Sequence, residues 1–340
     1  MHRGSYRAVQ VSTRGKLELV EKEVIQPPPG KVRIAVEACG VCHSDMVTVE
    51  SVLPNIKYPR VPGHEVVGKI DAVGENVLDW SVGQRVAVGY LAGPCHRCTP
   101  CRKGDFSSCL NQGATGVSSD GGYAEVMIAD QYALAAVPHE LSAIEAAPLI
   151  CAGLTTFNAL RNSPARAGDL VAIQGIGGLG HLGVQFARAM GFRVAAIARG
   201  SDKTALVKQL GAHHYVDSQR EDPVAALKAL GGATVILATV PSGQAMSSLI
   251  GGLARGGTMV VVGVGPDSID IPATQLVLES RSIHGSLTGS AIDGEETLSF
   301  SALSGVRPMI ETVPLEQAPA AYIRMMEGQA RFRMVLVTAQ

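Results

Sequence analysis

Short apolar runs rich in β-branched residues predict strands in roughly the first 130 residues of the chain. Residues 7–11 and 31–36 are interpreted as the strands of a β-hairpin, because the segment Pro27–Gly30 between them consists of turn-forming residues. Further strands are predicted at 66–73, 84–88 and 126–128. This pattern indicates a mainly antiparallel β-domain at the start of the chain.

The pattern changes in the second half, where apolar strands alternate with helical segments. A helix is predicted at 146–160, and a strand at 169–174 is followed by a helix that ends near Met190. The alternation continues with a helix at 203–210 and with strands at 193–198, near 215, at 234–240 and at 258–263, while His213 and His214 are interpreted as loop residues. Such alternation predicts an α/β domain with a doubly wound parallel sheet.

Length and charge narrow the class of protein. A chain of 340 residues is longer than one hydrophobic core usually supports, so two domains are expected. The 29 basic and 30 acidic residues leave a net charge of -1, which disfavours a nucleic-acid or membrane surface. The N-terminus lacks the apolar run of a signal peptide, and no segment is expected to approach the roughly 20 apolar residues that span a bilayer. A cytoplasmic enzyme is therefore predicted.

The cysteines, 7 in number, are expected to be reduced in that compartment, which favours metal binding over disulfides. Cys95, Cys98, Cys101 and Cys109 are spaced closely enough to enclose one tetrahedral metal ion. A site closed by four thiolates has no position for a substrate, so a structural zinc is predicted. The rival interpretations are a redox or iron–sulfur site and a nucleic-acid-binding zinc ribbon, and the few basic residues of this loop disfavour the ribbon.

A second group of metal ligands is predicted around the stretch 39–74. Cys42 and His64 flank a short loop, and Cys151 is the candidate for a third ligand. A catalytic zinc has three protein ligands and one open position. The alternative for each residue alone is a buried thiol or a hydrogen-bonded core histidine, and Cys39 is interpreted as a packed thiol of this kind.

A glycine-rich turn follows the strand predicted at 169–174 and opens the helix after it. Its residues are Gly175, Ile176, Gly177, Gly178, Leu179 and Gly180. Glycines at such a turn let the backbone approach a pyrophosphate, and the helix N-terminus attracts the anion. The strand, turn and helix together predict a dinucleotide-binding site.

The end of the strand at 193–198 bears on the choice of dinucleotide. An NAD-specific site places an acidic residue about 20 residues beyond the glycine-rich turn, where it binds the ribose hydroxyls. This chain has Ala198 there, followed by Arg199 and, one turn later, Lys203. Because arginine can bind two phosphate oxygens together, the segment predicts NADP as the preferred cofactor, with NAD as the alternative.

The combination of Gly63-His64-Glu65 with Gly68 and Gly74 resembles the signature of the zinc-dependent medium-chain alcohol dehydrogenases, and the resemblance extends over essentially the whole chain. It implies a Rossmann-type doubly wound domain and a mainly antiparallel, GroES-like catalytic domain. The catalytic domain would comprise residues 1–152 and 287–340, with a structural zinc lobe at 93–110. The nucleotide-binding domain would comprise residues 153–286.

The same resemblance implies roles for individual residues. Ser44 would relay the substrate proton, Asp45 would orient His64, and Glu65 would approach the catalytic zinc from behind. The further cofactor contacts would be His43, Thr155, Val262, Gly263, Val264 and Arg333, with His43 and Arg333 near the pyrophosphate. Tyr90 and Leu287 would line the substrate pocket. A histidine that passes the proton to solvent in many family members is replaced here by Val47.

These features predict a zinc-dependent alcohol dehydrogenase or aldehyde reductase that transfers a hydride between an alcohol and NADP or NAD. We expect two zinc ions per chain, an apolar primary alcohol or aldehyde as substrate, and a homo-oligomer, a tetramer rather than a dimer. The alternatives are a polyol or amino-alcohol dehydrogenase of the same family, a zinc-free quinone reductase, and a non-catalytic scaffold that binds zinc and nucleotide. Turnover of a panel of substrates separates them.

Overall fold

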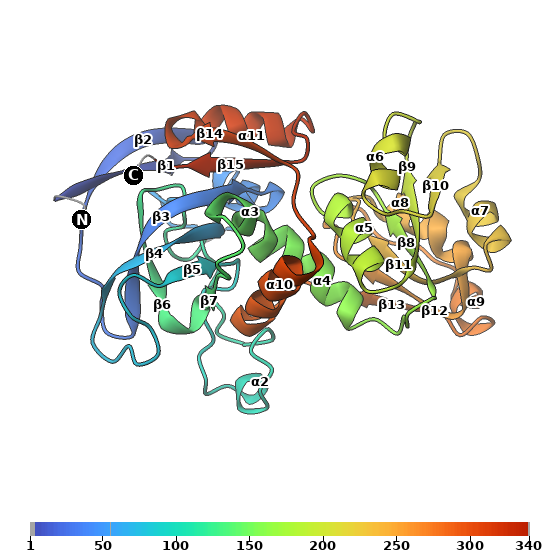
Figure 1. The fold of residues 1–340 in the computed structure, drawn as a ribbon, viewed down its shortest axis with the longest axis horizontal. Helices are drawn as coiled ribbons and strands as arrows, with labels where there is room; N and C mark the ends of the chain where they lie inside the picture. Colours follow the sequence, from blue (N-terminus) through green and yellow to red (C-terminus); the bar gives the residue numbers. More distant parts are fainter. Residues whose placement is uncertain (1–3, 55, 339–340) are drawn as a thin grey trace. The chain divides into compact units, whose positions relative to one another are not determined.

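Two large β-sheets organise the chain in the computed structural model, which describes residues 4–54 and 56–338. They belong to separate units. The first unit runs to Leu154 and resumes at Gly289, and the second contains Thr155–Thr288. The expected boundaries, after residues 152 and 286, fall two residues earlier in each case. Because the first unit uses both ends of the chain, its blue N-terminal strands lie beside red C-terminal strands in Figure 1.

The sheet of the first unit is mainly antiparallel and is built around β3 (Lys31–Val41). One edge of β3 pairs with β4 (Glu65–Val73), and the other edge is shared by β6 (Val126–Asp130) and β15 (Arg333–Val337). The sheet is completed by β5 (Arg85–Val88), β7 (Leu134–Ala136) and β14 (Ile310–Pro314). Alternate residues along the first half of β3 are buried, which is the pattern of a strand with one face on a core. The predicted antiparallel domain is confirmed.

The N-terminal hairpin differs from the expected one. β1 (Ser5–Thr13) pairs with β2 (Lys16–Glu23), whereas β3 belongs to the larger sheet. The turn between β1 and β2 contains Gly15 in the left-handed conformation, with φ near 75°, which glycine adopts without strain. The charged residues of β2 conceal its strand pattern in the sequence. The proline-rich segment before β3 therefore connects two sheets and not two strands of one hairpin.

Short helices complete the first unit. They are α1 (Met46–Val49), α2 (Thr99–Arg102), α3 (Ala143–Pro148), α10 (Ala291–Ser304) and α11 (Ala318–Met326), with 3-10 turns η1 (His43–Asp45), η2 (Gln131–Ala133) and η5 (Leu315–Gln317). The helix expected at 146–160 is not continuous. α3 ends at Pro148, η3 (Leu149–Gly153) is a π-turn, and α4 (Leu154–Arg161) follows. Proline has no N–H to donate, so the regular bonding is disturbed at this point.

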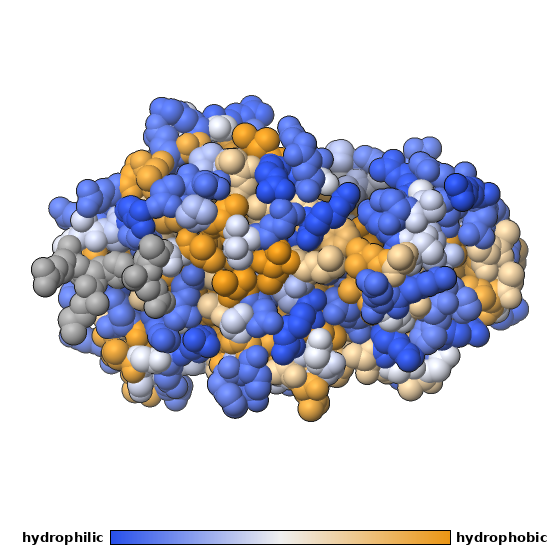
Figure 2. Space-filling view, turned by 45° about the horizontal axis from the view of Figure 1, so that its top comes forward, coloured by the Kyte–Doolittle hydropathy of each residue, from blue (hydrophilic) through white to orange (hydrophobic). Residues whose placement is uncertain are grey.

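One helical stretch, Ala143–Arg161, is long and apolar enough to cross a membrane by length and composition alone. This corrects the expectation that no segment approaches such a length. In the structure 78% of its most apolar window is buried inside the protein, which is the environment of a core helix. Figure 2 shows polar side chains over most of the visible face, with apolar side chains in separate patches.

The second unit contains a parallel sheet with the strand order β10-β9-β8-β11-β12-β13. Its strands are β8 (Leu170–Gln174), β9 (Arg193–Ala198), β10 (His214–Asp217), β11 (Ala233–Ala238), β12 (Leu253–Val261) and β13 (Ser282–Gly285). The connecting helices are α5 (Gly180–Ala189), α6 (Thr204–Gln209), α7 (Pro223–Ala229), α8 (Gly243–Leu249) and α9 (Ala273–Val277), with η4 (Ile250–Gly252). Numbered within this unit, the order is 3-2-1-4-5-6, the order of the doubly wound dinucleotide-binding fold. The predicted fold class is confirmed.

The adjacent histidines are more ordered than the loop interpretation implied. His214 is the first residue of β10. His213 accepts a hydrogen bond at Nδ1 from the backbone N–H of Val194 at 2.9 Å, and its Nε2 lies 2.9 Å from a guanidinium nitrogen of Arg188. The loop interpretation therefore holds for His213, which attaches the bend before β10 to β9, and is wrong for His214, which pairs with Ala195 in the sheet.

The glycines of the turn after β8 have different physical roles. Gly175 adopts φ near 89°, which permits the sharp change of direction after the strand. A Cβ atom built on Gly180 would lie 1.8 Å from the carbonyl oxygen of Gly175, so only glycine lets α5 begin this close to the strand. A Cβ atom on Gly177 would meet nothing within 4 Å, and its backbone faces open space.

We predict that Gly180→Ala destabilises the protein, because the added methyl group overlaps the Gly175 carbonyl. Overpacking of this kind typically costs about 1–3 kcal/mol. Gly177→Ala is the matched control, since its methyl group meets no neighbour, and it should leave the melting temperature close to that of the native protein. Thermal unfolding of the three proteins measures the difference. Equal melting temperatures for both variants would contradict the assignment of Gly180 to close packing.

Candidate active site and structural metal site

Four potential metal ligands converge within the first unit. Cys42 follows β3, His64 precedes β4, Glu65 is the first residue of β4, and Cys151 lies on the π-turn η3. One ligand atom from each residue lies within 4.8 Å of the others. The buried Oε2 atom of Glu65 has no hydrogen-bond partner, so the group offers a carboxylate oxygen beside two sulfurs and an imidazole nitrogen. This donor set fits a zinc ion.

The π-turn is what brings Cys151 to the other ligands. Its Sγ atom lies 4.0 Å from Sγ of Cys42 and 3.4 Å from Nε2 of His64. The hydrogen bond from Cys151, together with the nearby His64, lowers the pKa of Cys42 well below its ordinary value. A thiol that ionises readily is ready to bind a metal. π-turns occur often at functional sites, and this one positions a ligand.

Asp45 fixes the orientation of His64. Its Oδ1 atom lies 3.0 Å from Nδ1 of His64, and both side chains are buried. A carboxylate only accepts hydrogen bonds, so Nδ1 carries the proton and Nε2 is left free for the metal. Burial opposes protonation of His64, but Asp45 and the Cys42 thiolate outweigh it and raise its pKa well above the ordinary value. The geometry is that of the expected orienting carboxylate.

Arg333 reaches this cluster from β15. Its guanidinium forms an ion pair and a hydrogen bond with Glu65, and only 4% of the residue is exposed. Burial raises the pKa of Glu65 to about 7, and the nearby Arg333 limits that rise. The Nε atom of Arg333 is buried without a partner. The structure thus places Arg333 beside Glu65 in the first unit, and its contact with a pyrophosphate stays a prediction.

Ser44 and His43 lie on the turn η1, between the ligand Cys42 and the orienting Asp45. Both side chains are exposed, whereas Cys42 and Asp45 are buried. The turn therefore holds Cys42 and Asp45 inward and presents the Ser44 hydroxyl outward, two residues after Cys42 and one residue before Asp45. Val47, on the helix α1 that follows, has no group that can take up a proton.

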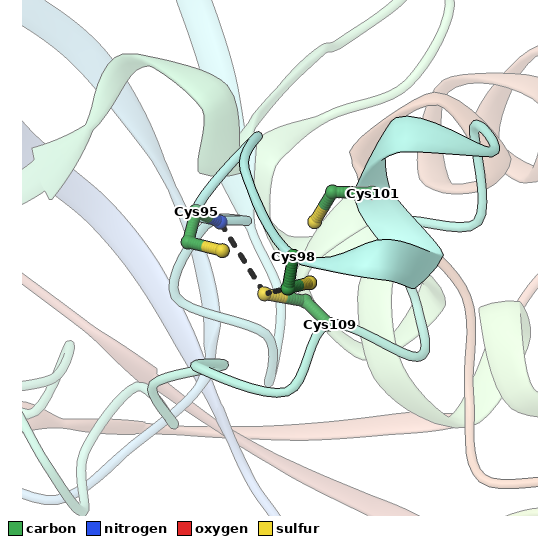
Figure 3. Close-up of side chains that lie close together, drawn as sticks. All are labelled: Cys95, Cys98, Cys101 and Cys109. Atoms are coloured by element: carbon green, nitrogen blue, oxygen red, sulfur yellow. Dashed lines mark hydrogen bonds between the residues drawn. The ribbon is translucent and has the colours of Figure 1, made fainter.

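The second cluster consists of the four predicted cysteines, Cys95, Cys98, Cys101 and Cys109. Figure 3 shows their side chains directed toward one another, with Cys101 carried by α2. Sγ of Cys109 accepts a hydrogen bond from the Cys95 backbone N–H at 3.3 Å. The backbone N–H of Arg97 and the amide of Asn111 lower the pKa of Cys95 to about 5, which favours its thiolate. Four thiolates that enclose one point fit a structural zinc.

The predicted nucleotide-binding residues lie in the second unit. β9 ends at Ala198, Arg199 is exposed, and the ammonium group of Lys203 donates to the carbonyl of Ile176 in the glycine-rich turn at 3.0 Å. Val262 and Gly263 both donate their backbone N–H to the carbonyl of Ala238 at 3.0 Å. The neighbouring Val264 is 81% exposed, so its backbone lies at the surface of this unit.

The predicted substrate-pocket residues are divided between the units. Tyr90 lies in the first unit, where its ring contacts the ring of His64 edge to face at 5.1 Å. Leu287 lies in the second unit and is 65% exposed, and its carbonyl accepts a 3.5 Å hydrogen bond from Thr155. Tyr90 is therefore placed directly beside a metal ligand.

Sequence reasoning assigned no role to Tyr123, which is fully buried and donates its hydroxyl to Asp45 Oδ2 at 2.8 Å. The only signal for it was the segment Gly121-Gly122-Tyr123 before β6. Two adjacent glycines mark a close approach of backbones, and that approach is to the segment that carries His64.

Comparison with known proteins agrees with this arrangement. Residues 28–139 match the family model "Alcohol dehydrogenase GroES-like domain", and residues 178–303 match "Zinc-binding dehydrogenase". An alcohol dehydrogenase of Penicillium expansum, patD, is 41% identical over 320 residues and 94% of each chain. Among solved structures, a protein named CAD from Helicobacter pylori with NADP(H) has a TM-score of 0.87 at 26% identity, covering 99% of each chain. Acetophenone reductase from Geotrichum candidum with NAD has a TM-score of 0.86 at 26% identity, covering 99% of this chain and 98% of that one.

The doubly wound sheet, the GroES-like unit and the cysteine–histidine cluster define a zinc-binding dehydrogenase. The chain belongs to the zinc-dependent medium-chain alcohol dehydrogenase family. It is an NAD(P)-dependent oxidoreductase that acts on alcohols.

We predict that Cys42→Ser and Cys98→Ser have different consequences. Cys42→Ser removes a ligand from the candidate catalytic site, next to the exposed Ser44, whereas Cys98→Ser removes one of the four ligands of the closed structural site. Cys42→Ser should abolish turnover in a protein that unfolds at nearly the native temperature. Cys98→Ser should lower the melting temperature, since a structural metal contributes directly to folding free energy. Melting curves, turnover and zinc content of both variants provide the test. Full turnover in Cys42→Ser with a reduced zinc content would contradict the assignment.

Proposed function

We propose that this dehydrogenase holds two zinc ions with unequal roles and interconverts apolar primary alcohols and aldehydes, with NADP preferred over NAD. The observation that carries the proposal is the pair of ligand clusters in one chain, one of four cysteines and one of mixed ligands. When bound, zinc at Cys42, His64 and Cys151 supplies a Lewis acid toward the substrate oxygen, and the nicotinamide supplies hydride chemistry.

Proton movement is assigned to Ser44. Its hydroxyl is exposed and lies on the same tight turn as Cys42, so it is held close to the metal ligands without being buried among them. A hydroxyl group both accepts and donates protons, which a relay requires. Because Val47 cannot continue the relay, Ser44 would pass the proton to water or, with the cofactor bound, to one of its ribose hydroxyls.

The preference for NADP rests on the end of β9. An acidic residue is absent at Ala198, and the exposed Arg199 follows it. Lys203 adds a second cation whose ammonium group already contacts the glycine-rich turn. A 2′-phosphate placed near this turn would meet donors and positive charge and no carboxylate at position 198.

The substrate is assigned from Tyr90, whose aromatic ring packs on His64 within the first unit. An aromatic surface beside a metal ligand favours an apolar primary alcohol or aldehyde over a polyol, which needs several hydrogen-bond partners. A homotetramer in the cytoplasm, with a small-molecule substrate and without a nucleic-acid or membrane partner, completes the proposal. The balanced charge of the chain supports the last part of this proposal, that no nucleic acid or membrane is a partner.

We predict that Ser44→Ala lowers kcat by roughly 100-fold or more, the scale of a positioned proton-transfer group. Ser44→Thr keeps the hydroxyl group and should retain most of the activity, so it controls for disturbance of the turn. Steady-state rates with one alcohol at saturating cofactor measure the effect. A fall in kcat of less than about threefold in Ser44→Ala would show that water takes the proton directly.

We predict a higher kcat/KM with NADP than with NAD for the same alcohol. Arg199→Ala should lower the value for NADP by about 10-fold or more, as expected for the loss of charged hydrogen bonds, and should leave the value for NAD almost unchanged. Lys208→Ala removes an exposed cation from α6 and controls for net charge. An NAD preference in the native enzyme, or an unchanged efficiency with NADP in Arg199→Ala, would overturn this part of the proposal.

A further inference from the structure

We infer that Tyr123 is a positioning residue for the metal site of Cys42, His64 and Cys151, and that it acts through Asp45. The inference rests on the proposed function, because it assumes that this cluster binds zinc. Tyr123 does not reach the ligands themselves. Its hydroxyl holds the carboxylate that holds the ligand histidine.

The three side chains form a continuous chain of hydrogen bonds. The Tyr123 hydroxyl donates to Oδ2 of Asp45 at 2.8 Å, and Oδ1 of Asp45 lies 3.0 Å from Nδ1 of His64. The Cys42 backbone N–H also donates to Oδ2, at 2.9 Å. Asp45 thus accepts three hydrogen bonds, two of which come from residues that carry metal ligands. A carboxylate with both oxygens occupied cannot rotate away from His64 without losing bonds.

The backbone fixes Tyr123 in place. The N–H groups of Gly122 and Tyr123 donate to the carbonyls of Gly63 and Pro62, each at 3.0 Å. The segment with Tyr123 is therefore attached directly to the segment with His64.

Close packing removes the remaining freedom of the ring. A Cβ atom on Gly63 would lie 2.4 Å from the Tyr123 ring, so the ring occupies the space that the missing side chain leaves. Tyr123 is fully buried. Its hydroxyl has one fixed direction, toward Asp45.

Tyr123 remains a hydrogen-bond donor under all physiological conditions. Burial raises the pKa of its hydroxyl well above the ordinary value, and the nearby Asp45 adds to the shift. The hydroxyl therefore supplies a permanent donor, as an orienting residue must. Groups that orient a metal ligand from outside typically change metal affinity by 10–100-fold when they are removed.

The test compares zinc affinity in the holoenzyme and in Tyr123→Phe, which removes only the hydroxyl oxygen. Competition with a chelator should show that the Kd for zinc at the Cys42 site is raised by about 10-fold in Tyr123→Phe. This is the lower end of the range for residues that orient a metal ligand, because Tyr123 acts on His64 only through Asp45. Zinc at the four-cysteine cluster provides an internal reference and should be released as in the native protein. Tyr322→Phe is the matched control, since Tyr322 is also a buried tyrosine of the first unit but donates its hydroxyl to Oε1 of Glu50 at 3.4 Å and not to Asp45.

A spectroscopic measurement separates positioning from general stability. With cobalt in place of zinc, the ligand-field bands report the geometry around the metal, and Tyr123→Phe should shift them while Tyr322→Phe should not. Melting temperatures establish that both variants are folded. In an Asp45→Ala background, Tyr123→Phe should have no further effect on zinc affinity, because its only route to the ligands is gone.

The outcomes distinguish the inference from the proposed function. Absence of zinc from the Cys42 site of the native enzyme would overturn the proposed function. Native zinc affinity and native cobalt bands in a folded Tyr123→Phe protein would overturn the inference alone. Additive effects of Tyr123→Phe and Asp45→Ala on zinc affinity would overturn it as well, since they would show that Tyr123 does not act through Asp45.

Discussion

The first unit depends on the burial of ionisable side chains at one point. Cys42, His64, Glu65 and Asp45 are each no more than 5% exposed, and their charged forms are mostly negative. Buried charges cost several kcal/mol each unless they are paired. Arg333 compensates Glu65, and His64 lies beside Asp45 and the Cys42 thiolate, but the hydrogen bond to Cys42 and burial raise the pKa of Cys151 well above its ordinary value, so this thiol stays protonated. A divalent cation held by these ligands would allow both thiols to ionise, so metal binding is coupled to the protonation of the ligands.

This constraint explains why rigid backbone surrounds the ligands. They come from the end of β3, the start of β4 and a turn after α3, which are far apart in the sequence. Close approaches at Gly63 and Gly121 attach the segment that carries His64 to the segment that carries Tyr123, and the Tyr123 ring occupies the space beside Gly63. The four-cysteine cluster is assembled more simply, because its ligands all lie between Cys95 and Cys109 and a single loop brings them together. The Cys42 site, in contrast, forms only when the sheet of the first unit is in place.

The sequence predicted those structural features that one local pattern of residues determines. Five strands of the parallel sheet, the glycine-rich turn and the four-cysteine cluster follow from apolar runs and ligand spacing. The strand β13 was not predicted, and the full set of ligands around Cys42 was implied by the family resemblance. The pairing of β1 with β2 was missed because charged residues mask β2, and the π-turn at Cys151 was missed because helical periodicity does not reveal a single widened turn. The contacts of Tyr123 with Asp45 and of Arg333 with Glu65 join residues 78 and 268 positions apart, and no local pattern encodes such pairs.

The second unit shows that the position of an acidic residue matters less than what its carboxylate already binds. Asp217 stands at the end of β10, the strand next to β9, and could be taken for the acid that repels a 2′-phosphate. Yet its Oδ1 atom accepts the N–H groups of Gly200, at 2.8 Å, and Gln219, at 3.0 Å. The residue is 6% exposed, and the two bonds to Oδ1 hold the turn after Arg199, while the buried Oδ2 atom has no hydrogen-bond partner and lies 3.7 Å from Nε of Arg220. A buried carboxylate that fixes this turn also fixes the backbone from which Arg199 projects. The same residue type that excludes NADP at the end of the second strand therefore has a structural role one strand away, where it holds the turn after Arg199.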